Sequence, residues 1–194
     1  MKKLFLGLGL VAGTFAFAQT FGIKGGMNVS SLSNDAGLDD SKSKIGFNAG
    51  VFMNAPLAES FSIQPEVLYS QYGSKAESGN TSTSLKFDYI TVPVMFQYNA
   101  TPEFYLEAGP EFGFMTSAKG KVEVGDNSQT VDLNKDNYNT FNFGVGLGAG
   151  YYFTPNIGLT ARYVAGFTDI AKDRPNGSDA VKNNVFQVGL AYKF

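Results

Sequence analysis

The stretch that decides the fold is residues 141–151, which reads FNFGVGLGAGY. Its odd-numbered positions carry Phe, Val, Leu, Ala and Tyr, whereas its even-numbered positions carry Asn and then four glycines. Successive side chains of a β-strand point to opposite faces, so this strand has one bulky apolar face and one polar face with almost no side chains. A soluble barrel would turn the bulky face inward. The small polar face instead favours a narrow, filled interior and an apolar outside in contact with lipid.

The same period of two recurs along the chain, and no segment beyond residue 18 has a convincing helical period. We expect eight strands, at about 20–29, 44–55, 61–70, 84–98, 104–114, 141–151, 157–167 and 186–194. Connections after the second, fourth and sixth strands are short. Connections after the first, third, fifth and seventh strands are long and polar, at about 30–43, 73–83, 117–138 and 168–183. This alternation predicts an all-β, eight-stranded antiparallel up-and-down transmembrane β-barrel with short periplasmic turns and long extracellular loops.

Aromatic residues gather near the expected strand ends, as two girdles at the membrane interfaces would. The expected periplasmic girdle consists of Phe61, Tyr98, Phe104, Tyr151, Phe153, Tyr192 and Phe194. The expected outer girdle consists of Tyr69, Phe87, Phe112, Phe114, Tyr138, Phe141 and Phe167. Within the strands, Pro65 and Pro93 cannot donate a backbone hydrogen bond, so we predict a bulge or a local break in pairing at each.

The first 18 residues have the features of a secretory signal. Lys2 and Lys3 form a positive start, residues 4–11 form a short apolar core, and Ala16 and Ala18 supply the small residues that a signal peptidase requires. The apolar run is shorter than the roughly 20 residues that span a bilayer. We therefore expect a cleaved signal at 1–18 and an exported barrel domain at 19–194.

Composition excludes several function classes. The 194 residues include no Cys and no His, and the formal net charge is -2. Disulfide scaffolds, thiol nucleophiles, Ser-His-Asp sites and Cys- or His-rich zinc sites are therefore excluded. The sequence has no cluster of Lys and Arg, so it shows no electrostatic footprint for nucleic acid. We expect no enzyme activity, no cofactor and no nucleic-acid partner.

Five charged residues are candidates for one network because they fall on the polar, lumen-facing side by parity, as Lys193 also does; the five are Lys24, Glu66, Glu107, Glu111 and Arg162. Glu107 and Glu111 are four strand rises apart, about 14 Å, which is beyond the separation of paired glycosidase carboxylates. An unpaired charge inside the barrel would be costly. We therefore predict that the five residues form a structural charge network around Arg162, and not a catalytic pair.

The glycines at 144–150 also lie on the lumen face. A strand without side chains leaves volume for large residues from other walls, and the candidates are Leu68, Tyr105, Tyr152 and Arg162. Although Gly144, Gly146 and Ala149 match the spacing of a dinucleotide loop, no helix is expected to follow them. Close packing is the interpretation that fits the strand pattern.

The chain ends with apolar or aromatic residues at alternate positions, at Val188, Leu190, Tyr192 and Phe194. This end resembles the signature that the outer-membrane barrel assembly machinery reads. The whole exported chain resembles small outer-membrane β-barrel families, both the OmpA and OmpX type and, more closely, the porin-like PorT-type family. The closer resemblance is carried by FGIKGGMN at 21–28, QPEVLYSQ at 64–71, YITVPVM at 89–95 and GVGLGAGY at 144–151. It implies the fold, an outer-membrane location in a Gram-negative-type bacterium and an assembly signal at Leu190, Tyr192 and Phe194, but no activity.

Three function classes remain open. The first is a structural or surface-interaction barrel whose outside loops contact surface or host ligands, with outer-membrane lipid and the assembly machinery as further partners. The second is a small porin, which is opposed by geometry because eight strands leave an interior just wide enough for side chains. The third is a soluble periplasmic ligand-binding barrel, which the bulky apolar face disfavours. Membrane fractionation and conductance measurements distinguish the three.

Overall fold

The computed structural model describes residues 19–32, 41–79, 81–124, 127–172 and 180–194, and the predicted signal at 1–18 lies outside them. The strands are β1 (Thr20–Leu32), β2 (Ser41–Ala58), β3 (Phe61–Ser78), β4 (Thr81–Asn99), β5 (Phe104–Val124), β6 (Asn127–Asp132), β7 (Phe141–Tyr152), β8 (Ile157–Gly166) and β9 (Asn183–Lys193), with one short 3₁₀ helix, η1 (Lys135–Asn137). None of the helices in these ranges is long and apolar enough to cross a bilayer.

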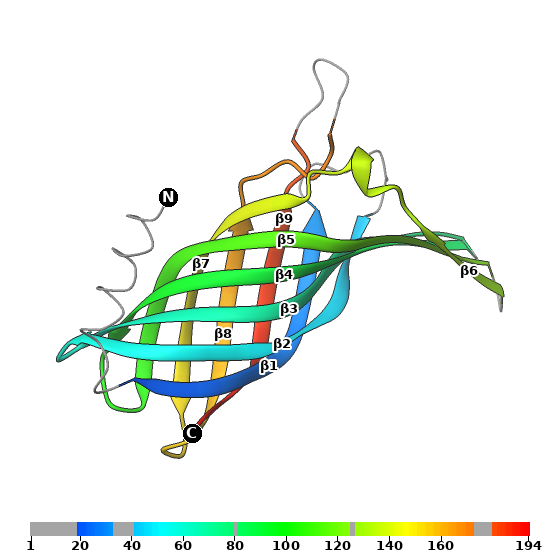
Figure 1. The fold of residues 1–194 in the computed structure, drawn as a ribbon. Helices are drawn as coiled ribbons and strands as arrows, with labels where there is room; N and C mark the ends of the chain where they lie inside the picture. Colours follow the sequence, from blue (N-terminus) through cyan, green and yellow to red (C-terminus); the bar gives the residue numbers. More distant parts are fainter. Residues whose placement is uncertain (1–18, 33–40, 80, 125–126, 173–179) are drawn as a thin grey trace, which may run out of the picture.

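Eight of the nine strands close into a ring (Figure 1). All pairings are antiparallel: each strand from β1 to β4 pairs with the next one, β5 pairs with β7, β7 with β8, β8 with β9, and β9 with β1. The remaining strand, β6, pairs with the far end of β5. Ring closure lets every strand bond to a neighbour on both sides, as a hydrocarbon surrounding demands. The predicted eight-stranded antiparallel barrel is confirmed.

The apolar face of the ring points outward. Leu147 on β7 is 68% exposed, and Leu159 and Tyr163 on β8 alternate with the buried Thr160 and Arg162. Many large apolar side chains lie on the outside of the ring. Exposure of so large an apolar surface to water is unfavourable, whereas lipid would cover it. The orientation predicted from residues 141–151 is therefore confirmed.

Both prolines lie at breaks in the ladders. In the described strands, Pro65 has Val94 of β4 as its partner but no partner on β2, and Pro93 has Glu111 of β5 but no partner on β3. The β2–β3 register is the same before and after Pro65, so the irregularity there is a gap and not a bulge. Because proline has no N–H, the ladder opens on the side that the missing donor would face.

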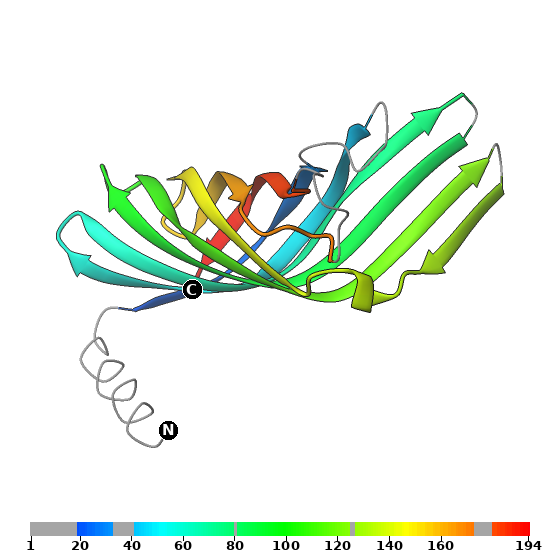
Figure 2. The same ribbon diagram turned by 90° about the horizontal axis from the view of Figure 1, so that it is seen from above.

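Two of the predicted loops are wrong, because they are mainly strand. The segment expected as a loop at 73–83 is the end of β3 and the start of β4, and the segment at 117–138 contains the end of β5, all of β6 and η1. Together these strands form a sheet that extends beyond the ring, here called the projecting sheet (Figures 1 and 2). Its strands alternate polar with apolar or β-branched residues, as residues 121–124 (Lys, Val, Glu, Val) do. This pattern favours β-strands, so the strands can continue to pair beyond the membrane.

Two members of the expected outer girdle, Phe87 and Tyr138, pack against each other and do not face lipid. Phe87 is 1% exposed, and its ring meets Tyr138 edge-on, with 5.3 Å between the ring centroids. Phe87 has the same parity as the lumen-facing Tyr89 and therefore points to the inner side, where the segment after β6 covers it. Other girdle residues do face outward, including Phe114, Phe141 and Phe167 near the outer rim and Phe61, Tyr98, Tyr192 and Phe194 near the periplasmic rim.

Candidate functional site

Arg162 on β8 lies in the middle of the lumen and is 1% exposed. Its Nη1 and Nη2 donate to Glu66 Oε2 and Oε1 on β3 at 3.0 and 2.7 Å, in the two-pronged geometry that suits a carboxylate. Its Nε donates to Glu107 Oε1 on β5 at 2.7 Å. The strand β8 is not a neighbour of β3 or β5 in the ring, so this one side chain crosses the barrel and joins three parts of its wall.

Further polar groups surround the two carboxylates. Lys24 Nζ lies 3.4 Å from Glu66 Oε1, and the Gln64 side-chain amide donates to the same oxygen at 2.9 Å. The Gln97 amide donates to Glu107 Oε2 at 3.1 Å. Two cations thus accompany two carboxylates, and the amides occupy further acceptor positions. This arrangement satisfies buried charge, as a structural network requires.

Glu111 was expected in this network, but the ion pairs found within the described ranges do not include it. Its Oε1 accepts a hydrogen bond from the Tyr72 hydroxyl at 2.7 Å. The ring of Tyr72 in turn packs against Tyr89, with 5.3 Å between the centroids. The reason is distance, because Glu111 is four residues along β5 from Glu107, about 14 Å, and one guanidinium cannot reach both.

Layers of side chains lie on both sides of the charge network. On the periplasmic side, the rings of Tyr105 and Tyr152 lie 6.1 Å apart and pack with Phe52, and Lys193 Nζ lies 3.6 Å from the centre of the Tyr152 ring. On the outer side, a larger apolar cluster includes Leu32, Tyr72, Tyr89, Met115, Val164 and Val185. Side chains therefore occupy the interior at three successive levels.

Glycines make room for the largest of these side chains. A Cβ added to Gly150 on β7 would collide with the ring of Tyr105, and one added to Gly146 would lie 3.3 Å from Cδ of Arg162. The predicted role of the β7 glycines is confirmed for these two side chains. Glycines of other strands face the remaining two candidates, with Gly50 against Leu68 and Gly158 against Tyr152.

The predicted assembly residues lie on the outside of β9 at its periplasmic end. Leu190, Tyr192 and Phe194 are all exposed, and Phe194 donates its backbone N–H to the carbonyl of Phe21 on β1 at 2.9 Å. This contact places the end of the chain against the first strand of the barrel. Their role as a signal remains a prediction.

Sequence analysis did not identify the neutral partners of the network. Gln64 and Gln97 are hydrogen-bonded to the carboxylates, and Tyr72 is hydrogen-bonded to Glu111. Parity does place all three on the lumen face, so the strand pattern contained the signal. It could not show which polar groups share one level of the barrel, because that depends on the stagger of the strands.

A closed ring of antiparallel strands, with an apolar band outside and a charged, hydrogen-bonded interior, defines a transmembrane β-barrel. The family model described as an outer membrane protein beta-barrel domain matches residues 17–172, and the chain belongs to this family. The protein is accordingly an outer-membrane barrel of a Gram-negative-type bacterium, in contact with membrane lipid.

Solved structures share the fold at low sequence identity. Ail, the attachment invasion locus protein of Yersinia pestis, solved in complex with the heparin analogue sucrose octasulfate, is 18% identical with a TM-score of 0.52 and aligns over 92% of this chain and 100% of its own. Neisserial surface protein A is 16% identical with a TM-score of 0.56 and aligns over 91% of this chain and 99% of its own. Among curated protein sequences, none matches the chain significantly.

Proposed function

We propose that this barrel has a lumen closed by its own side chains and acts at the cell surface through its projecting sheet and extracellular loops. The observation that carries the proposal is the contrast between the two ends of the same strands. Inside the ring, β3, β4 and β5 enclose buried, paired side chains, whereas beyond it they continue with β6 as an open sheet on which side chains such as Val122 and Val124 are exposed.

The interior supports a role that does not involve transport. An eight-stranded ring is just wide enough to be filled by side chains. Arg162 spans this space and is bonded to both Glu66 and Glu107, so a continuous water path would require these bonds to break. The alternative function, a small porin, needs such a path.

The same contacts support the absence of enzyme activity. Both carboxylates at the centre are held by one guanidinium, and each also accepts a hydrogen bond from a glutamine amide. A general acid must hold a proton, and a nucleophile must be accessible to the substrate. A carboxylate that accepts hydrogen bonds from a guanidinium and from an amide is suited to neither role. We assign these residues to holding the barrel wall together.

The projecting sheet supports a surface role. Every residue of β6 is exposed, and β6 pairs with β5 along one side only in the described ranges. Its other edge offers backbone N–H and C=O groups to a partner strand or to a polar ligand. Because the sheet continues the strands of a rigid ring, it holds this edge in a fixed position above the membrane.

Insertion of an epitope after Gly79 tests the topology. Gly79 lies in the tip between β3 and β4, and nothing surrounds the position where a Cβ would stand. An antibody should label the epitope on intact cells. Labelling that requires permeabilised cells would contradict the proposal.

Trimming the projecting sheet tests the function. Segments 75–84 and 119–132 are replaced together by short turns, and heat-dependent gel mobility verifies that the ring still forms. Cells with the full chain should attach to one another or to immobilised extracellular matrix better than cells with the trimmed chain at equal surface amounts. Equal attachment would contradict a surface-interaction role.

A further inference from the structure

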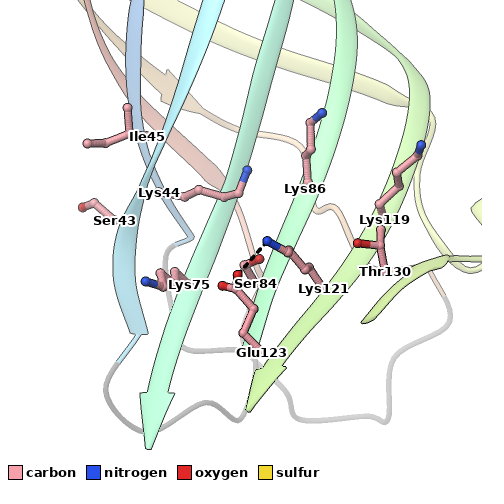
Figure 3. A pocket seen from close by; sticks show the side chains of 10 residues that line it. All are labelled: Ser43, Lys44, Ile45, Lys75, Ser84, Lys86, Lys119, Lys121, Glu123 and Thr130. Carbon is pink, nitrogen blue, oxygen red and sulfur yellow. Dashed lines mark hydrogen bonds and ion pairs between the residues drawn. The ribbon is translucent and has the colours of Figure 1, made fainter. Parts of the chain in front are cut away.

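Five lysines that are scattered in the sequence come together on one side of the projecting sheet and the adjoining part of β2 (Figure 3). They line an open groove of about 680 Å³ with Ser84 and Thr130 between them. This set, here called the lysine face, consists of Lys44, Lys75, Lys86, Lys119 and Lys121.

Strand pairing places these lysines on a common face. Lys86 on β4 is the direct partner of Lys119 on β5, and Ser84 is the direct partner of both Lys75 and Lys121. Direct partners in a ladder point to the same side of a sheet. Like charges placed directly opposite each other destabilise a sheet, so the Lys86 and Lys119 pair costs folding energy that a bound anion would offset.

The fifth lysine reaches the others across a glycine. Gly73 on β3 is the partner of Lys86 and has a φ of 150°, and a Cβ added to it would lie 3.0 Å from Cδ of Lys44. The Lys44 side chain therefore runs over the backbone of β3 towards Lys86, as Figure 3 shows. A side chain at position 73 would block this path.

Nearby carboxylates partly balance the lysine face. The ion pairs are Lys86 with Asp88 at 3.6 Å, Lys119 with Asp132 at 3.7 Å and Lys121 with Glu123 at 2.6 Å. The side chains of these three lysines are 35–44% exposed. Exposed ion pairs of this kind contribute little to stability, and their partners are easily replaced by other ions. The ammonium groups of these three lysines are therefore available to a multivalent anion.

The position of the lysine face identifies the anion. Lys86 has the same parity as Ile90, which pairs with the outward-facing Phe114 of the outer girdle. Lys86 lies four residues before Ile90 on β4, which is about 14 Å nearer the outer end of the strand. The lysine face is therefore the continuation of the lipid-facing side, just beyond the aromatic band that marks the interface. Lipid headgroups begin at this level of a membrane.

We propose that the lysine face binds the phosphate groups of anionic lipid in the outer leaflet and so fixes the projecting sheet at the membrane surface. This site is separate from any ligand of the sheet edge and does not depend on the proposed surface function. Basic residues next to an anionic leaflet gain affinity by the same electrostatic attraction in other membrane proteins.

Lipid selectivity of the reconstituted barrel tests the proposal. Spin-labelled phosphatidylglycerol and phosphatidylcholine are compared for immobilisation by the barrel in phosphatidylcholine vesicles. The variant K86Q/K119Q removes two charges from the lysine face, and K135Q/K172Q removes two from exposed positions outside the groove. Heat-dependent gel mobility verifies that both variants form the ring.

The wild-type chain and the control variant should prefer phosphatidylglycerol, and salt should weaken the preference. K86Q/K119Q should lose most of it, because each lysine near an anionic surface gives roughly a fivefold gain in local affinity. Equal immobilisation of the two lipids by the wild-type chain, or an unchanged preference in K86Q/K119Q, would overturn the proposal. Lysine-dependent binding of soluble sucrose octasulfate without any lipid preference would also overturn it and assign the face to a soluble polyanion.

Discussion

Replacement of Arg162 by methionine is the sharpest perturbation of the barrel interior. Methionine keeps much of the side-chain volume but removes all three hydrogen bonds, at 2.7, 2.7 and 3.0 Å, that Arg162 donates to two carboxylates. Glu66 then keeps its ion pair with Lys24, whereas Glu107 loses the cation with which it is paired. Breaking a buried ion pair by removing one partner costs about 3–5 kcal/mol, so Arg162→Met should lower the free energy of unfolding by that amount.

The assay is reversible urea unfolding of the barrel in phospholipid vesicles, followed by circular dichroism and by heat-dependent gel mobility. A double variant, Arg162→Met with Glu107→Gln, serves as the matched control because it removes one cation and one carboxylate and leaves Glu66 paired with Lys24. Replacing a whole buried ion pair by neutral groups is often close to neutral. The double variant should therefore recover most of the loss.

Two results would refute this reasoning. If Arg162→Met were as stable as the wild-type chain, Arg162 would not hold the walls of the barrel together. If the double variant were as unstable as the single variant, the loss would come from packing around Arg162 and not from uncompensated charge.

Two further substitutions and one deletion test other parts of the barrel. Gly150→Val should destabilise the barrel by about 1–3 kcal/mol in the same unfolding assay, because the new side chain overlaps the Tyr105 ring, and adding Tyr105→Ala should recover part of the loss. Leu147→Arg places a charge near the middle of the lipid-facing band and should cost about 2–4 kcal/mol in vesicles; an unchanged stability there would contradict the outward orientation of β7. Deletion of Phe194 should reduce the amount of barrel in the outer membrane of cells but leave refolding of the purified chain in detergent unchanged, whereas equal amounts in cells would contradict an assembly signal.

Strand parity predicted the barrel because each transmembrane strand has one lipid face and one lumen face. The contrast is strongest at residues 141–151, where glycine alternates with large apolar residues, and it placed Arg162, Glu66 and Glu107 inside correctly. Parity could not show which of the lumen carboxylates Arg162 reaches. Its partners lie 96 and 55 residues away in the sequence, and strand stagger, not spacing, sets their common level.

The projecting sheet escaped sequence analysis for a related reason. Residues 81–86 and 127–132 are mostly polar, with Leu85 and Val131 as their apolar side chains, and such strands have the composition of a loop. The lysine face was missed as well, since Lys44, Lys86 and Lys119 belong to different strands and form no run in the sequence. Only the pairing of β2, β3, β4 and β5 brings such residues together.

Single-channel recording of the purified wild-type barrel in a planar bilayer tests the closed lumen most directly. Heat-dependent gel mobility of the same preparation establishes that the protein in the bilayer is folded. With the interior filled at three levels and Arg162 bonded across it, the folded barrel should show no steady unit conductance. Reproducible, long-lived openings of one unit size would contradict the account and establish a water path through the charge network.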